Sequence, residues 1–144
     1  MKYLIVLAAF AATALLIAAE GGGAATYVDH DKVTALFAKG GSIAKGADHS
    51  VAANRRTGPG KVEVHDKETD IFYVMEGEAT LVTGGKMIGG AQSRPDQWLG
   101  TDIQGGTAYH LTKGDIVTVP AGTPHWFKEV PKLIVYYTVK SVKP

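Results

Sequence analysis

The side chains best suited to chemistry in this 144-residue chain are Glu63, His65, Asp70 and His125. Glu63 and His65 alternate around Val64, so on a β-strand both side chains point to the same face. Asp70 follows five residues after His65, and a hairpin with a tight connection through Asp66–Thr69 would return it to the side of that histidine. Imidazoles and carboxylates suit a divalent transition metal such as Fe, Mn, Ni, Cu or Zn, with coordination positions left open for a substrate.

The stretch that ends at His125 is suited to presenting that histidine rigidly. An apolar β-type run, Ile116–Val119, leads into the turn sequence PAGTPH. Pro120 and Pro124 fix φ, and Gly122 permits a positive φ between them. We therefore expect His125 to stand on a pre-organised backbone, whereas an isolated histidine on a strand is more often a surface residue.

The amino-acid composition excludes several kinds of functional site. The chain contains no cysteine, which excludes disulfides, thiolate zinc sites and iron–sulfur clusters. The formal net charge is +1 and the charges are scattered, so we expect no nucleic-acid partner. With 45% hydrophobic residues the chain can bury the core of one domain.

The N-terminus has the layout of a secretory signal peptide. Lys2 precedes an uninterrupted apolar run from Tyr3 to Ala19, which Glu20 and a glycine cluster end. We assign residues 1–25 to the signal and residues 26–144 to a single domain. This predicts a secreted or periplasmic protein without a membrane association after cleavage. The alternative is an uncleaved anchor, because the run approaches the ~20 residues that span a bilayer.

The remaining elements are one short helix and many short strands. The helix is expected from Asp29 or Asp31 to Gly40. Residues 84–106 are expected to form a long loop with a weak strand around Trp98–Ile103. The expected strands are Ser50–Arg56, Lys61–His65, Ile71–Glu76, Ala79–Thr83, Thr107–Leu111, Asp115–Val119, His125–Glu129 and Leu133–Val139. Such a series predicts an all-β, antiparallel sandwich or barrel.

The spacing of these residues resembles the two motifs of the cupin superfamily. Its second motif is a glycine, five residues, a proline, one residue, a glycine, two residues and a histidine. Gly114, Pro120, Gly122 and His125 match that spacing throughout. The asparagine usual four residues later is replaced by Glu129.

The first cupin motif is matched less completely. His65 takes the place of its second histidine, Asp70 that of its acid and Gly77 that of its glycine. Glu63 stands where the first histidine would be, which is the main departure. The resemblance is to small, secreted, single-domain bacterial cupins of the conserved-barrel cupin 2 type.

The resemblance implies a jelly-roll β-barrel with a metal in its mouth, and a homodimer. Carried over position by position, the metal ligands are His65, Asp70 and His125, with Glu63 as a further candidate. This set is more anionic than the family's usual three histidines and one glutamate, which favours a harder divalent ion. Alternatively, Glu63 pairs with a basic neighbour and leaves the other three as a facial triad. The basic neighbours are Arg55, Arg56 and Lys61.

The candidate ligands and the resemblance lead to three hypotheses about function. The first is a metal-dependent enzyme acting on a small organic molecule, with Glu63 as general base if it is not a ligand. The second is a binding module that holds a small molecule or a metal in the barrel mouth without turnover. The third is a barrel whose site has degenerated through the replacement at Glu63.

Overall fold

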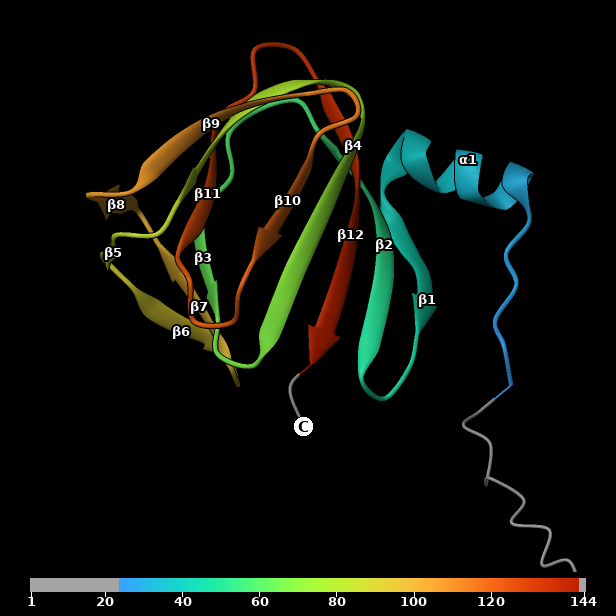
Figure 1. Ribbon diagram of the computed structural model, residues 1–144, viewed down its shortest axis with the longest axis horizontal. Coiled ribbons are helices and arrows are strands. Elements are labelled where there is room, and N and C mark those ends of the chain that lie inside the picture. The colour runs from blue at the N-terminus through green and yellow to red at the C-terminus, as the bar shows by residue number, and fades with distance from the viewer. Residues whose placement is uncertain (1–23, 143–144) are drawn as a thin grey trace, which may run out of the picture.

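The computed structural model describes residues 24–142, which form a curled antiparallel β-sheet and one short helix (Figure 1). This confirms the expected all-β class with an N-terminal helix. Residues 1–23, and so nearly all of the expected signal peptide, lie outside the described part. No helix within residues 24–142 combines the length and the apolar character needed to span a bilayer. The elements are α1 (His30–Lys39), β1 (Gly41–Lys45), β2 (His49–Arg56), β3 (Val62–His65), β4 (Glu68–Thr83), β5 (Lys86–Ile88), β6 (Ala91–Arg94), β7 (Gln97–Gly100), β8 (Asp102–Gln104), β9 (Thr107–Thr112), β10 (Ile116–Val119), β11 (His125–Glu129) and β12 (Ile134–Val142).

The helix α1 lies on the outside of the barrel next to β1 and β2 (Figure 1). Asp29 caps it by accepting the backbone N–H of Lys32 at 3.0 Å, and Gly40 ends it with φ 78°. The ring of Phe37 packs edge-on against Tyr137 of β12, with 4.6 Å between the ring centroids. The helix therefore covers the outer face of the sheet and stays away from the barrel interior.

Two walls of the barrel share the long strand β4. One wall runs β1-β2-β12-β4, with β10 also paired to β4. The other contains β9, β11, β3, β7 and β6, attached through the second half of β4. The change of wall occurs near Gly77, whose φ is 77°. The sequence predicted two strands with a turn at Glu76–Glu78. That was wrong, because the glycine bends one continuous strand.

The segment 84–106 also differs from the prediction of a long loop. It contains four short strands, of which β6 and β7 extend the second wall and β5 and β8 form a separate two-stranded sheet. The strand expected around Trp98–Ile103 is present as β7 and β8. The short strand β1 was not predicted at all. Its residues, GSIAK, carry too little apolar alternation to stand out.

The core fills the space between the two walls. Its largest fully buried side chains are Leu81, Ile134, Val62 and Val74, each worth about 1.5–3 kcal/mol of hydrophobic stabilisation. Aromatic rings close the core on the side of the candidate site. Phe72, Phe127 and Tyr136 pack on one another there, with ring centroids 4.8–5.6 Å apart.

Candidate metal centre

Residues Glu63, His65 and Asp70 come together from two different walls. The sequence suggested that the strands carrying them form a hairpin. That was wrong, because β3 pairs with β11 and β7, whereas the start of β4 pairs with β10 and β12. The short connection between β3 and β4 nevertheless returns Asp70 to His65. The Oδ2 atom of Asp70 lies 3.5 Å from Nε2 of His65.

The turn before β11 fixes the position of His125. Gly122 has φ 78°, and its N–H donates to the carbonyl oxygen of His65 at 2.7 Å. In the register between β11 and β3, His125 is directly opposite Glu63. The Nδ1 atom of His125 lies 3.1 Å from the carbonyl oxygen of Thr123. Because a carbonyl can only accept, Nδ1 is the donor in this contact, and Nε2 is the nitrogen that faces Asp70.

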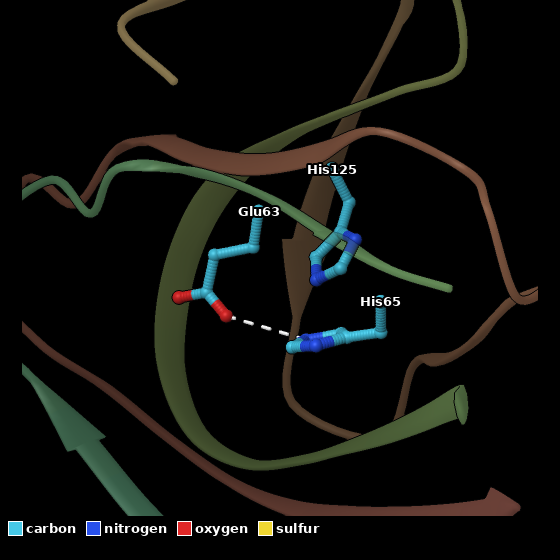
Figure 2. A group of neighbouring side chains, drawn as sticks. All are labelled: Glu63, His65 and His125. Atoms are coloured by element: carbon cyan, nitrogen blue, oxygen red, sulfur yellow. Dashed lines mark ion pairs between the residues drawn. The ribbon is translucent and has the colours of Figure 1, made fainter. Parts of the chain in front are cut away.

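The potential ligand atoms converge on one small volume (Figure 2). The Oε2 atom of Glu63 lies 3.4 Å from Nε2 of His65, and Oδ2 of Asp70 lies 3.5 Å from Nε2 of His125. Glu63, His65 and His125 each offer one ligand atom, all within 4.8 Å of one another. Two ligands bound at about 2.1 Å to a common ion are themselves roughly 3.0–3.4 Å apart. The observed separations fit such a site with little movement.

Glu68 is a site residue that sequence reasoning missed. Its place just before an apolar run is typical of a solvent-facing turn charge, but Glu68 begins β4 and its side chain is only 23% exposed. Its Oε2 atom lies 3.5 Å from Nδ1 of His65, on the side of the ring away from Glu63. Glu68, His65 and Asp70 form a second group with ligand atoms within 4.8 Å. The available signal was the spacing of Glu68 and Asp70, which puts both on one face of a strand.

The buried polar atoms of the cluster are incompletely satisfied. His65 is 3% exposed, yet neither of its ring nitrogens makes a hydrogen bond of good geometry with another described residue. Leaving a buried donor or acceptor unpaired costs about 1–3 kcal/mol. A metal ion bound at Nε2 of His65 would remove part of that cost. The donor set therefore fits a divalent metal.

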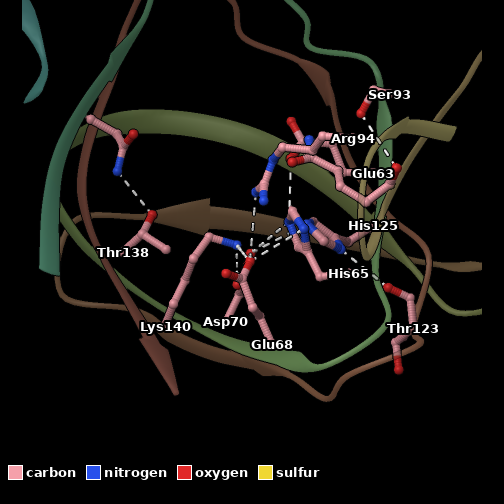
Figure 3. Close-up of polar contacts among 12 residues, drawn as sticks. Glu63, His65, Glu68, Asp70, Ser93, Arg94, Thr123, His125, Thr138 and Lys140 are labelled. Carbon is pink, nitrogen blue, oxygen red and sulfur yellow. Dashed lines mark hydrogen bonds and ion pairs between the residues drawn. The ribbon is translucent and has the colours of Figure 1, made fainter. Parts of the chain in front are cut away.

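Two cations contact carboxylates of the cluster, and Figure 3 shows one of them, Lys140. Lys140 of β12 places Nζ 2.7 Å from Oδ1 of Asp70 and 2.9 Å from Oε2 of Glu68. Arg56 of β2 places Nη2 3.8 Å from Oε1 of Glu63. Of the basic partners considered for Glu63, Arg56 is the one in ion-pair contact. Since Glu63 turns its other oxygen to His65, pairing with Arg56 leaves that oxygen free to bind a metal.

The surroundings keep Glu63 and Asp70 ionised. Contact with the His65 imidazole is the largest influence on Glu63 and lowers its pKa. For Asp70, burial is the largest influence and pushes the pKa up, but contacts with His125 and Lys140 outweigh it and the net pKa is lowered. Both groups are therefore carboxylates at neutral pH, the form in which they bind cations.

A cavity of about 520 Å³ opens beside the cluster. Glu63, Asp70 and His125 line it together with the rings of Phe72 and Tyr136. A volume of this size accommodates a small organic molecule. The cluster thus combines candidate metal ligands with space for a ligand next to them.

The other histidines lie elsewhere. His30 is exposed on α1, His49 pairs with Asp48 at 2.7 Å, and His110 faces Glu78 at 3.3 Å. None of them lines the cavity. All three are exposed surface residues.

Comparisons with solved structures show that the barrel has a known fold. A protein from Bacillus halodurans is 16% identical, with a TM-score of 0.59 over 85% of each chain. The structure of KdgF from Halomonas sp. is 16% identical, with a TM-score of 0.52 over 73% of this chain and 80% of that one. The cupin domain of Cnp3 from Schizosaccharomyces pombe is 11% identical, with a TM-score of 0.53 over 72% and 60%. At these identities the likeness concerns the fold alone.

A family comparison gives the assignment directly. No curated protein matches the sequence. The family profile described as Cupin matches residues 11–144 and so covers almost the whole chain, including both motifs. Because the match spans far more than half of the sequence, the chain belongs to the cupin family.

Proposed function

We propose that the barrel binds one divalent transition metal through His65, Asp70 and His125, with Glu63 as fourth ligand, and that it acts on a small organic molecule in the adjoining cavity. The observation that carries this proposal is the state of His65. Both of its ring nitrogens are buried without a hydrogen bond to a described residue, and Nε2 faces two carboxylates. Such a site is costly unless a cation occupies it.

The residues of the cluster would have different roles in the proposed function. Asp70 gives one oxygen to Lys140 and turns the other toward the two imidazoles, so its orientation is fixed before any ligand arrives. Glu63 is ionised at neutral pH and lines the cavity, so it can accept a proton from a bound substrate whenever it is not itself a ligand. A bound metal would supply Lewis-acid chemistry, or oxygen chemistry if it is iron.

The alternative function is a binding module without turnover. It is favoured by the cavity, which is large enough to retain a small molecule and whose polar groups could hold that molecule in place. The two functions differ in their products. An enzyme converts a candidate substrate at a rate that depends on the metal, whereas a binding module is stabilised by its ligand and releases it unchanged.

The test is the metal content of purified protein. We expect close to one divalent metal per chain by elemental analysis after expression in metal-supplemented medium. His125→Ala should lose the metal and keep the β-rich circular dichroism spectrum. His110→Ala is the matched control, because it removes a histidine outside the cavity, and it should keep the metal. Metal-free wild-type protein would refute the proposed metal site, and full metal content in His125→Ala would refute the ligand assignment.

We also propose that the protein is exported, that residues 1–25 are removed and that residues 26–144 act as one domain in a homodimer. The apolar run Tyr3–Ala19 supports export. The unpaired edges of a small barrel favour pairing with a second copy. N-terminal sequencing of the protein from fractionated cells tests the first point, and light scattering tests the second. An intact N-terminus on cytoplasmic protein, or a monomeric mass, would contradict them.

A further inference from the structure

The charges that line the cavity are unevenly distributed. Five cationic side chains face three carboxylates, which leaves a surplus of two positive charges. The whole chain has a net charge of only +1, so the surplus is a local property of the cavity. The cations are Lys45, Arg56, Lys61, Arg94 and Lys140, and the carboxylates are Glu63, Glu68 and Asp70.

The three carboxylates of the cavity each have a cation in contact with them. Arg56 approaches Glu63, and Lys140 contacts Asp70 and Glu68. Arg94 adds a third cation, with Nη2 3.9 Å from Oε2 of Glu68. Three carboxylates are thus matched by three cations before any metal binds. A divalent ion would therefore bring a charge that these side chains do not neutralise, and an anionic ligand could neutralise it.

The surplus resides in Lys45 and Lys61. Lys45 ends β1 and Lys61 lies just before β3, so the two lysines reach the cavity from different walls. Both residues are exposed, and neither forms an ion pair with any residue in the described range 24–142. Unpaired charges of one sign along a cleft concentrate oppositely charged small molecules within it.

Apolar rings form part of the cavity wall, with 3–4% of each residue exposed. Phe72, Phe127 and Tyr136 line the same cavity. Inorganic ions gain nothing from aromatic surface, whereas the carbon skeleton of an organic acid does. We propose that the cavity selects a small organic acid, attracted by Lys45 and Lys61 through its carboxylate and packed by its body against these rings. This deepens the proposed function by naming the class of its ligand.

The test compares acids with their neutral amides. Malonate, succinate and benzoate are each titrated calorimetrically beside malonamide, succinamide and benzamide, into metal-loaded and metal-free protein. We expect at least one acid to bind at least tenfold more tightly than its amide. The double variant Lys45→Gln/Lys61→Gln should weaken that binding roughly threefold to fivefold per lysine and leave the metal content unchanged.

A matched control removes the same charge elsewhere. Lys113 and Lys132 are exposed and do not line the cavity, so Lys113→Gln/Lys132→Gln should leave the affinity unchanged. An equal loss in both double variants would overturn the inference, as would equal affinities for all three acids and their amides. Inorganic phosphate that binds as tightly as the best acid would also overturn it, since an inorganic oxyanion would then suffice.

The outcomes separate this inference from the proposed function. If the protein binds no metal but the metal-free form prefers an acid through Lys45 and Lys61, the proposed metal site fails and the ligand class stands. If the protein binds its metal but shows no preference for an acid, the ligand class fails and the metal site stands.

Discussion

The side chain of Glu68 lies 3.5 Å from Nδ1 of His65, while Nε2 faces Asp70. A carboxylate that accepts the proton of one ring nitrogen orients a metal-binding histidine and leaves its other nitrogen for the metal. We therefore expect Glu68 to act as a positioning residue, rather than as a ligand, once a metal is bound. Its role is distinct from that of Asp70, because only Asp70 also reaches His125.

Replacing Glu68 should therefore weaken metal binding without abolishing the fold. We expect Glu68→Gln to lower the affinity for the bound metal by about tenfold, within the range seen when such partners are removed. Competition against a chromophoric chelator measures the affinity. Glu78→Gln is the matched control, because Glu78 faces the exposed His110 outside the cavity. An unchanged metal affinity in Glu68→Gln would mean that Glu68 only pairs with Lys140 and does not orient His65.

At the scale of elements, the shared strand β4 depends on Gly77. The residue has φ 77°, and a Cβ added there would collide with the carbonyl oxygen of Leu133. A left-handed conformation costs about 1–2 kcal/mol for residues other than glycine, and the collision adds to that cost. We expect Gly77→Ala to lower the free energy of unfolding by at least about 2 kcal/mol, measured by urea denaturation.

Gly84 supplies the control for this experiment. It also has φ 77°, but a Cβ added there would meet no other atom within 4 Å. Gly84→Ala should therefore lower the free energy of unfolding only by the cost of the left-handed conformation, about 1–2 kcal/mol. Equal losses in the two variants would show that the chain relieves the collision with Leu133 at no cost.

The sequence predicted the local parts of this architecture well. Alternation around Val64 put Glu63 and His65 on one face, and the turn sequence before His125 predicted its rigid presentation. The pairing of strands that lie far apart in the sequence was harder to predict. A short connection after His65 suggested a hairpin, but the register of β11 against β3 decides the pairing. Gly77 reads as a turn because a glycine that bends a strand and one that reverses it look alike in sequence.

At the scale of the whole molecule, the carboxylates of the cluster link stability to pH. The pKa values of Glu63 and Asp70 are lowered by the fold, so the unfolded chain binds more protons in the acidic range. Their contribution to stability is fully present above their ordinary pKa values, 4.5 and 3.8, and is lost as the pH falls through the lowered values.

This predicts a pH-dependent difference between wild type and Asp70→Asn. In metal-free protein, the difference in the free energy of unfolding should shrink as the pH falls from about 5 to about 3, because the unfolded wild-type chain protonates Asp70, at its ordinary pKa of 3.8, before the folded protein does. Urea denaturation at a series of pH values measures it. A difference that stays constant over this range would mean that Asp70 is not stabilised as an anion.

The candidate ligands are also far apart along the chain, since Glu63 and Asp70 precede His125 by more than fifty residues. A growing polypeptide cannot complete the site until β11 has been synthesised and has paired with β3. Loading of the proposed metal would therefore follow closure of the barrel. If the protein is exported as we propose, the compartment in which the chain folds, rather than the one in which it is translated, would decide which ions compete for the site.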